Sequence, residues 1–547
     1  MARDAGTQYD GGMSRILTMS LLAMLALGTV CAQQATPPKT TAESSAYTET
    51  SRAADVARFV EACSQLPHGD RLVAGSMGRT HEDREMLLVR TALPGANPLA
   101  HLRVVVIGNI HAGEVEGKEA VQELLREFAL GEHEALLQRC TIWFVPIYNV
   151  DGNEAVKVGN RRGQNGPDAV GRRPNGQGLD LNRDFVKADA PETRALLGLF
   201  DEVDPHLFVD LHTTNGSHHG YHLTYAPSLN PNVDHGVDRF TRAMLERVRA
   251  RLQDQDVETF DYGNFETRDW DGGGAPSSRG GERGWYTYDS RARYGINYFG
   301  LRNRLSVLSE AYSYADFETR IRATKAFVLG LLQDLVAHED EATATMAAAD
   351  RRATSGDLPV WFGTATTFSA PEQLDVLVGE VDRIEGEDGR PTRFARKDQS
   401  APEQMRVFRR FRATQRQRLP AAWAVLDPTP EVVQRLRWHG VAFEELDAAT
   451  AARARTFRVD KLRKPKRPYQ GHQALVLEGA WQDARDVTLP RGALLVPARQ
   501  PRARVAATLL EPLSEDGLST WNFFEDQTDE TFPVLRLVAL PGGAAGR

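Results

Sequence analysis

Short apolar runs alternate with amphipathic helical segments from about residue 51 to residue 339. Four of these runs have the length of strands and are rich in β-branched or aromatic residues: LRVVVIGNI, TIWFVPIYN, HLFVDLH and RLSVLSE. Helical periodicity is found at 115–129, 191–203, 235–253 and 316–338. Strands that alternate with helices along a chain form a sheet covered by helices. We therefore predict an α/β fold with a mixed, mostly parallel sheet and helices on both faces.

The chain is longer than one such fold needs. At 547 residues it exceeds the size at which a single hydrophobic core stops growing. A helix tail and a linker at 340–356 end the first region, and apolar runs then recur with one clear helix at 430–439. We predict a first domain over residues 51–340 and a β-rich accessory domain over 357–547. The formal net charge of −8 argues against nucleic-acid binding.

The N-terminus has the pattern of an export signal. Arg15 precedes a long apolar run, and the small residues Cys31 and Ala32 end that run. We predict a signal peptide over residues 1–32, a flexible linker over 33–50, and export to the periplasm or the extracellular space. No stable membrane insertion is expected after cleavage, and the alternative is an uncleaved membrane anchor.

Two cysteines, Cys63 and Cys140, remain in the predicted mature chain. They lack the close spacing of a structural zinc site, and two cysteines do not make a disulfide scaffold. We expect two buried thiols, although a single bridge would suit an oxidising compartment.

Polar residues follow the predicted strands at the points where these strands end. His111 and Glu114 follow the first strand, and His212 and Glu310 end two later ones. Ligands of open α/β sheets bind outside the carboxyl ends of the strands, so we expect these side chains to meet. Two histidines and one carboxylate, with one position left open, are the ligand set of a catalytic zinc ion.

The segment GRRPNGQGLDLNRDF at 171–185 carries an Asn-Arg pair. A guanidinium group binds a carboxylate through two parallel hydrogen bonds, and a neighbouring amide adds a donor. Asn182 and Arg183 are therefore candidates for binding a carboxylate. The alternative is a surface turn.

Four motifs together resemble those of the zinc metallocarboxypeptidases of the carboxypeptidase A type: HxxE at 111–114, then GLDLNRDF, VDLHTTNG and LSEAYSY. Their order is also that of the family, and the resemblance covers about residues 50–339. It implies a carboxypeptidase-like fold, one zinc ion and a peptide substrate with a free C-terminal carboxylate.

The resemblance also implies roles for individual residues. The zinc ligands would be His111, Glu114 and His212. Asp180 would orient a ligand histidine, because such outer partners fix the position of the ring. Asn182 and Arg183 would hold the terminal carboxylate, and Glu310 would act as general base for a zinc-activated water.

The chain departs from the family pattern at three places. Gly113 stands where many members carry an arginine. The arginine that polarises the scissile carbonyl is assigned to Arg172, with Arg162 as the alternative, because a gap-free comparison puts no arginine at that place. The tyrosine that closes over the substrate is assigned to Tyr288 by its spacing from the base, with Tyr298 as the alternative.

Three other functions remain open. An aspartoacylase-like zinc deacylase of N-acyl amino acids shares HxxE, an Asn-Arg pair and a distant histidine, although LSEAYSY favours the peptidase. A murein-peptide carboxypeptidase would perform the same chemistry on cell-wall peptides. The third possible function is that of a non-catalytic binding module on the same fold. Such proteins usually lack a metal ligand or the base, whereas this chain has all the ligands and the base.

The loop at 288–304 lies between the predicted tyrosine and the predicted base. It contains one acidic residue, Asp289, and four arginines: Arg291, Arg293, Arg302 and Arg304. If these arginines line the pocket, they favour substrates that end in an acidic residue. The alternative is that these arginines face solvent or pair within the domain.

Overall fold

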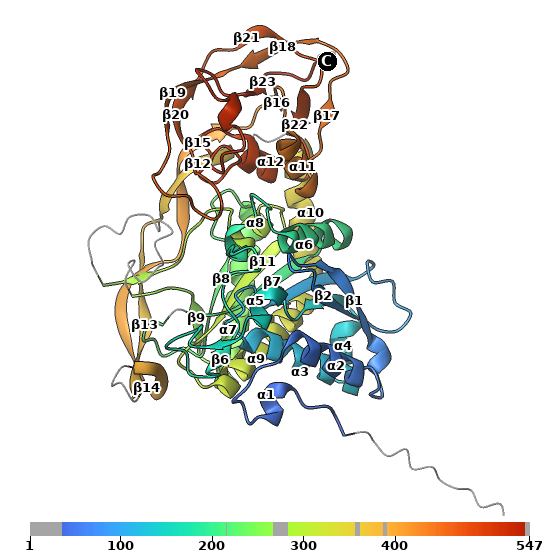
Figure 1. The fold of residues 1–547 in the computed structure, drawn as a ribbon, viewed down its shortest axis with the longest axis vertical. Coiled ribbons are helices and arrows are strands. Elements are labelled where there is room, and N and C mark those ends of the chain that lie inside the picture. Colours follow the sequence, from blue (N-terminus) through green and yellow to red (C-terminus); the bar gives the residue numbers. More distant parts are fainter. Residues whose placement is uncertain (1–35, 215, 266–282, 356–360, 387–390, 542–547) are drawn as a thin grey trace, which may run out of the picture. The chain divides into compact units, whose positions relative to one another are not determined.

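An eight-stranded mixed sheet forms the centre of the first region of the computed structural model (Figure 1). Its strands lie in the order β1-β2-β4-β3-β7-β11-β8-β9. The structure describes residues 36–214, 216–265, 283–355, 361–386 and 391–541, and residues 37–547 form one compact unit. The strands are β1 (Leu72–Arg79), β2 (Glu85–Thr91), β3 (Leu102–Gly108), β4 (Cys140–Val145), β7 (Leu207–Thr213), β8 (Leu223–Pro227), β9 (Thr259–Asp261) and β11 (Leu305–Ala311). The central strands β4, β3, β7 and β11 are parallel, and β1, β2 and β8 add antiparallel pairs. The predicted mixed sheet is confirmed.

Helices cover both faces of this sheet, because the side chains of each central strand alternate between two cores. Val104 and Val106 of β3 lie in a core with α2 (Ala53–Cys63), α3 (Glu116–Leu130), α7 (His235–Gln253) and α9 (Phe317–Ala337). Val105 and Ile107 of the same strand lie in a second core with α6 (Pro191–Val203) and α8 (Gly295–Gly300). The prediction of helices on both faces is therefore confirmed. Short elements complete this region: α4 (Glu134–Leu137), α5 (Val150–Glu154), β5 (Lys157–Val158), β6 (Ala169–Val170) and β10 (Trp285–Tyr286).

The C-terminal region is β-rich, as predicted. Its largest sheet runs in the order β17-β22-β16-β23-β18-β21. The strands are β16 (Ala422–Val425), β17 (Glu444–Glu445), β18 (Thr450–Arg455), β21 (Arg485–Leu489), β22 (Leu494–Pro497) and β23 (Val534–Leu537). Three antiparallel pairs accompany it: β12 (Trp361–Phe368) with β15 (Phe411–Arg418), β13 (Glu372–Glu385) with β14 (Pro391–Phe408), and β19 (Phe457–Arg463) with β20 (Val476–Trp481). Its helices are α11 (Pro430–Trp438) and α12 (Ala503–Leu510).

One core joins the two regions. Phe185 and Phe299 of the first region lie in the same cluster of buried side chains as Trp423 and Trp521 of the C-terminal region. Strand β10 also pairs with β14. Where the sequence predicted a helix tail and a linker, the structure has a full helix, α10 (Glu339–Ser355). The C-terminal region therefore buries apolar surface against the first.

Part of the segment that was expected to be a linker is hydrogen-bonded to the first region. Helix α1 (Thr41–Ser44) includes Glu43, which forms an ion pair of 2.5 Å with Arg126 of α3. Glu119 of α3 is fully buried and accepts a hydrogen bond of 2.9 Å from the hydroxyl of Thr50. Composition gave no sign of these contacts, because they depend on charged groups far away in the sequence.

Cys63 and Cys140 are free and buried, as expected, and burial raises the pKa of each thiol to about 12. Within the part of the chain that the structure describes, no helix is long and apolar enough to cross a bilayer. The predicted signal peptide, residues 1–32, lies outside the described residues.

Candidate metal centre and substrate site

Three strands bring four predicted site residues to one edge of the sheet. The loop after β3 carries His111 and Glu114, and a hydrogen bond of 2.9 Å from the backbone N–H of Glu114 to the carbonyl of His111 closes it. His212 belongs to β7 and Glu310 to β11, and these two residues are direct partners in the parallel register. Glu310 therefore lies beside His212.

The carboxylate of Glu114 lies between the two histidines. Its Oε1 is 3.0 Å from Nδ1 of His111, and its Oε2 is 2.9 Å from Nδ1 of His212. All three residues are buried, and their possible ligand atoms lie within 4.8 Å of one another. Although burial raises the pKa of Glu114, Arg161 and His111 hold it well below its usual value, and a metal ligand must be ionised in this way. Two imidazole nitrogens and a carboxylate fit a zinc ion.

A second carboxylate lies at the other nitrogen of each ring. Oδ1 of Asp180 is 3.1 Å from Nε2 of His111. Oδ2 of Asp210 is 2.9 Å from Nε2 of His212, although these two groups are not aligned as a hydrogen bond. Such partners orient the rings and leave Nδ1 for a metal. Sequence reasoning missed Asp210, although its position two residues before His212 in a strand places both on one face.

Arg161 contacts the cluster and was not predicted. It donates hydrogen bonds of 2.7 Å to Oε1 of Glu114 and 2.9 Å to the carbonyl of Thr213. A Cβ atom added at Gly113 would lie 3.5 Å from two carbons of the Arg161 side chain. The nearest atom to that Cβ would be the carbonyl oxygen of Gly171, at 3.2 Å, so Gly171 and Arg161 together border the space at Gly113. Its neighbour Arg162, the alternative for the carbonyl, is exposed.

Arg173, also not predicted, approaches the cluster from Asp180. Its Nε and Nη2 donate to Oδ2 of Asp180 at 3.0 and 2.8 Å, and its Nη1 is 3.8 Å from Oε1 of Glu114. Arg172, which the sequence comparison assigned to the carbonyl, instead donates to the backbone carbonyl of Asn175 at 3.1 Å. The loop between β6 and the 3-10 helix η2 (Leu181–Arg183) has no regular period, so sequence spacing could not tell the two arginines apart.

Glu310 has a buried oxygen that is open to a ligand. Its Oε2 has no hydrogen-bond partner among the described residues. Burial raises the pKa of Glu310 to about 8; His212 and Arg161 oppose the rise, and Glu114 and Asp210 add to it. A zinc ion beside it would act in the same direction as His212 and Arg161. A buried polar atom normally has a partner, so this oxygen suits a water molecule or a substrate group.

The predicted carboxylate-binding pair lies directly beyond Asp180. Asn182 and Arg183 belong to the 3-10 helix η2 (Leu181–Arg183), and the backbone N–H of Asn182 donates to Oδ1 of Asp180 at 2.9 Å. Nη1 of Arg183 is 3.7 Å from Oδ2 of Asp180, and its guanidinium carbon is 4.2 Å from the ring centre of Tyr294. Asp180 thus contacts both a candidate ligand histidine and the candidate carboxylate-binding arginine.

Of the two tyrosines considered from the sequence, Tyr288 is the one near the site. Its ring centre is 5.4 Å from that of Tyr294 and 6.0 Å from that of Tyr262. Burial raises the pKa of Tyr288, and the charge of Glu310 contributes. Tyr298 lies instead in the core, where its hydroxyl is hydrogen-bonded to a histidine of the C-terminal region. Tyr262 and Tyr294, which sequence reasoning missed, lie on either side of Tyr288 as its ring neighbours.

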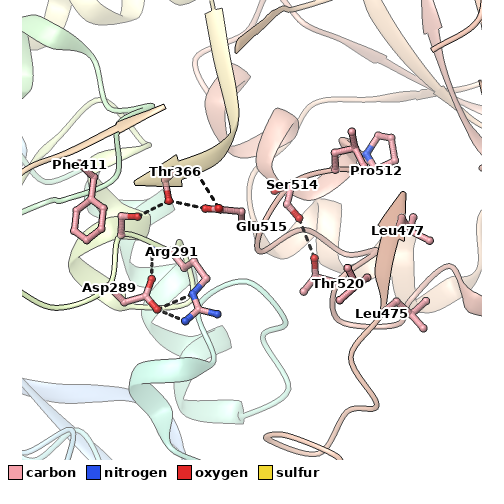
Figure 2. Close-up of a pocket in the computed structure, with 13 residues that line it drawn as sticks. Asp289, Arg291, Thr366, Phe411, Leu475, Leu477, Pro512, Ser514, Glu515 and Thr520 are labelled. Carbon is pink, nitrogen blue, oxygen red and sulfur yellow. Dashed lines mark hydrogen bonds and ion pairs between the residues drawn. The ribbon is translucent and has the colours of Figure 1, made fainter. Parts of the chain in front are cut away.

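The arginines of the 288–304 loop are paired inside the protein. The ion pairs are Arg291 with Asp289, Arg293 with Asp516, Arg302 with Asp201, and Arg304 with Asp204. Figure 2 shows Asp289 and Arg291 in contact at a cavity of about 340 Å³ that Glu515 of the C-terminal region also lines. The expectation that these arginines select acidic substrates therefore loses its basis. Three of them pair within the first region, and Arg293 pairs with the C-terminal region, which the sequence did not predict.

The fold and the buried cluster are those of an α/β metallohydrolase, in which strand ends carry the ligands. Comparison with known proteins gives the family. Residues 64–304 match the family model for zinc carboxypeptidases. Carboxypeptidase 2 of Trichophyton equinum is 25% identical over 466 residues, which cover 80% of this chain and 77% of that protein. Human Carboxypeptidase Z is 38% identical over 117 residues, which cover 20% of this chain and 18% of its own.

A crystal structure of a metallo-carboxypeptidase from Burkholderia cenocepacia matches 54% of this chain and 70% of its own, at 20% identity and a TM-score of 0.40. The family model and these sequence relatives agree that residues 64–304 form a zinc carboxypeptidase domain, the domain of a metallocarboxypeptidase hydrolase. The match to the Trichophyton protein is longer than the stretch 64–304, so that likeness continues outside the family domain.

Proposed function

We propose that this protein is a zinc-dependent carboxypeptidase that hydrolyses the last peptide bond of its substrate, with His111, Glu114 and His212 as zinc ligands. The observation that carries the proposal is that Asp180 contacts both His111 and Arg183. A metal site that shares a residue with a carboxylate-binding site suits cleavage next to a free C-terminus. Zinc held by the cluster would supply a Lewis acid and lower the pKa of a water molecule.

Glu310 is proposed as the general base. It takes a proton from the attacking water and delivers it to the amine of the departing residue. Its unpartnered Oε2 and its place beside His212 support this role. Glu114 is assigned to the metal together with both histidines, so Glu310, beside His212, is the carboxylate proposed for proton transfer.

Arg173 is proposed to face the carbonyl oxygen of the scissile bond. Asp180 holds its Nε and Nη2, which leaves Nη1 near Glu114. The Arg173 side chain is 33% exposed, whereas that of Arg161 is 17% exposed and donates to Glu114 and to backbone carbonyls. A substrate can therefore reach Arg173 more easily. Preorganised donors of this kind stabilise the charge that develops on the oxygen.

Asn182 and Arg183 are proposed to bind the terminal carboxylate, with Tyr288 and Tyr294 lining the space between them and the base. A carboxylate fits the guanidinium of Arg183 through paired hydrogen bonds. Because this site accepts a chain end and the metal cluster lies beside it, the enzyme removes one residue at a time from the C-terminus.

The test uses a matched pair of blocked dipeptides, one with a free terminal carboxylate and one with a terminal amide. We expect cleavage of the free acid alone, loss of cleavage with a chelator, and recovery with zinc. Zinc content by mass spectrometry should fall from one ion per chain to none in a variant with both His111→Ala and His212→Ala. Zinc retained in that variant would refute the ligand assignment.

The same assay separates the alternatives. Release of acyl groups from N-acyl amino acids, without cleavage of dipeptides, would favour the deacylase. Much faster cleavage of murein peptides than of blocked dipeptides would identify a cell-wall substrate. Substrate binding without any metal-dependent hydrolysis would favour a binding module.

We also propose that the protein is exported, on the strength of the apolar run after Arg15. N-terminal sequencing of protein recovered from outside the cytoplasm should begin near Gln33. Residues 1–32 retained in a membrane fraction would support the anchor instead.

A further inference from the structure

A turn of the C-terminal region, residues 469–472, contacts the segment that joins the metal cluster to the candidate carboxylate-binding pair. Oε1 of Gln470 accepts a hydrogen bond of 2.8 Å from the backbone N–H of Asp180. Asp180 is buried and Gln470 is half-buried, and a hydrogen bond is stronger where the surroundings hold little water. A side chain of the C-terminal region therefore fixes the backbone of the first region at Asp180.

The 469–472 turn holds Gln470 in a defined position. The backbone N–H of Tyr469 donates to the carbonyl of His472 at 2.8 Å, and the N–H of His472 donates to the carbonyl of Tyr469 at 3.1 Å. Gln470 and Gly471 have φ angles of 50° and 83°, which a tight two-residue hairpin turn requires. Nε2 of His472 lies 2.6 Å from Oδ2 of Asp189, so the turn is also fixed to the first region. The turn is therefore a rigid support for the Gln470 amide.

The other polar groups of Asp180 face the candidate site. Oδ1 lies 3.1 Å from Nε2 of His111, and Oδ2 accepts two hydrogen bonds from Arg173. The backbone carbonyl accepts a hydrogen bond of 2.9 Å from the N–H of Arg183. The backbone N–H is the remaining polar group, and Gln470 is its partner. A shift of the backbone at Asp180 would therefore displace a candidate ligand histidine and two candidate site arginines together.

We propose that Gln470 is a positioning residue for the metal cluster: it holds Asp180 where its carboxylate orients the ring of His111, so that the C-terminal region sets the zinc affinity of the first region. This inference rests on the proposed zinc-dependent function. If Gln470 only stabilised the contact between the two regions, its loss would lower the free energy of unfolding and leave the zinc affinity unchanged. Zinc affinity therefore separates the two roles.

The first experiment measures zinc affinity by competition with a fluorescent chelator. Gln470→Met keeps the length of the side chain and removes the acceptor, so the affinity should fall about 3–10-fold, the net worth of one hydrogen bond between neutral groups. Gln470→Glu keeps an acceptor and should bind zinc at least as tightly as the wild type. Gln473→Met is the matched control, because Gln473 donates only to the carbonyl of Pro465 within its own segment, and should keep the wild-type affinity.

The second experiment tests whether the effect passes through Asp180. Gln470→Met added to Asp180→Asn should lower the zinc affinity no further, because the carboxylate through which Gln470 acts is already gone. Hydrogen exchange of the zinc-free proteins should be faster over residues 179–183 in Gln470→Met than in the wild type. Gln470→Asn covers the case in which Gln470→Met does not fold: asparagine tolerates the left-handed backbone of this turn, but its shorter side chain cannot reach Asp180. It should lose the same zinc affinity.

The outcomes are distinct. Wild-type zinc affinity in Gln470→Met or Gln470→Asn, an equal loss in Gln470→Glu, or a further loss of the same size in the Asp180→Asn background each overturns the inference and leaves the proposed function standing. If the wild type binds no zinc, the proposed function fails, and this inference fails with it.

Discussion

Replacing Asp180 by asparagine should weaken zinc binding, because both oxygens of this carboxylate are in use. Oδ1 contacts Nε2 of His111 and the backbone N–H of Asn182, and Oδ2 accepts two hydrogen bonds from Arg173. Arg173 and Arg183 hold the pKa of Asp180 well below its usual value, although burial raises it. Asparagine keeps the shape but offers one acceptor oxygen and one NH₂ donor group. The asparagine can therefore satisfy either His111 or Arg173, but not both.

Each orientation of the new amide has a cost. If its oxygen faces Arg173, its N–H faces Nε2 of His111 and favours the tautomer with the proton on Nδ1, the atom that a metal needs. If its oxygen faces His111, its N–H group opposes the donors of Arg173. Loss of a partner that orients a ligand lowers metal affinity about 10–100-fold. Loss of the two charged hydrogen bonds from Arg173 would cost about 3 kcal/mol or more in the free energy of unfolding.

The assay is competition for zinc between the protein and a fluorescent chelator near neutral pH, with Asp180→Asn measured beside the wild type. Asp204→Asn is the control, because it removes a carboxylate paired with Arg304 on a different segment. The control should lose stability and keep the zinc affinity of the wild type. Equal zinc affinity in Asp180→Asn and the wild type would refute the view that Asp180 positions a ligand.

Three further outcomes are expected. Glu310→Gln should retain zinc and lower kcat by a factor of about 100 or more, because general-base catalysis contributes roughly 10²–10⁴; a kcat near that of the wild type would place the base elsewhere. Arg173→Ala should lower kcat by a factor of about 10²–10³, and Arg172→Ala should change it little. A larger loss of kcat in Arg172→Ala than in Arg173→Ala, measured in steady-state assays, would assign the carbonyl-facing role to Arg172. Burial lowers the pKa of His439 to about 4. As the pH falls, the unfolded chain protonates His439 near pH 6.5, whereas the folded protein does so only near pH 4. The free energy of unfolding should therefore fall by about 2 kcal/mol between pH 7 and pH 5 on account of His439. The free energy of unfolding of His439→Gln, measured by denaturant titration at several pH values, should lack that part of the pH dependence. The same pH dependence in His439→Gln and the wild type would contradict the prediction.

The sheet and the candidate metal cluster were predictable because their signals are local. An apolar run marks a strand, and a polar residue at its end marks the functional edge of the sheet. That reasoning led to His111, Glu114, His212 and Glu310, which the structure brings together. The Asn-Arg pair was recognisable for a similar reason, because its chemistry lies in two adjacent residues.

The rest depended on contacts between residues far apart in the chain. The 288–304 loop looked basic because its arginines were counted without their partners, such as Asp516 of the C-terminal region. The contact of Gln470 with Asp180 spans 290 positions and leaves no trace in any local pattern. Arg173 and Arg172 are neighbours of identical type, so only the course of the backbone could show which of them approaches Glu114.

The spacing between ligand and base is fixed by backbone hydrogen bonds between β7 and β11, in which Glu310 is the partner of His212. A slip of one residue would turn Glu310 to the opposite face of the sheet, so deletions within β11 cannot be tolerated. The chain between the two strands contains β8, which pairs with β11 in its own register, and α7, which packs in the core, so these elements share the restriction. Exposed positions in the loops that join them carry no register, so substitutions there can change substrate preference while the spacing between His212 and Glu310 stays constant.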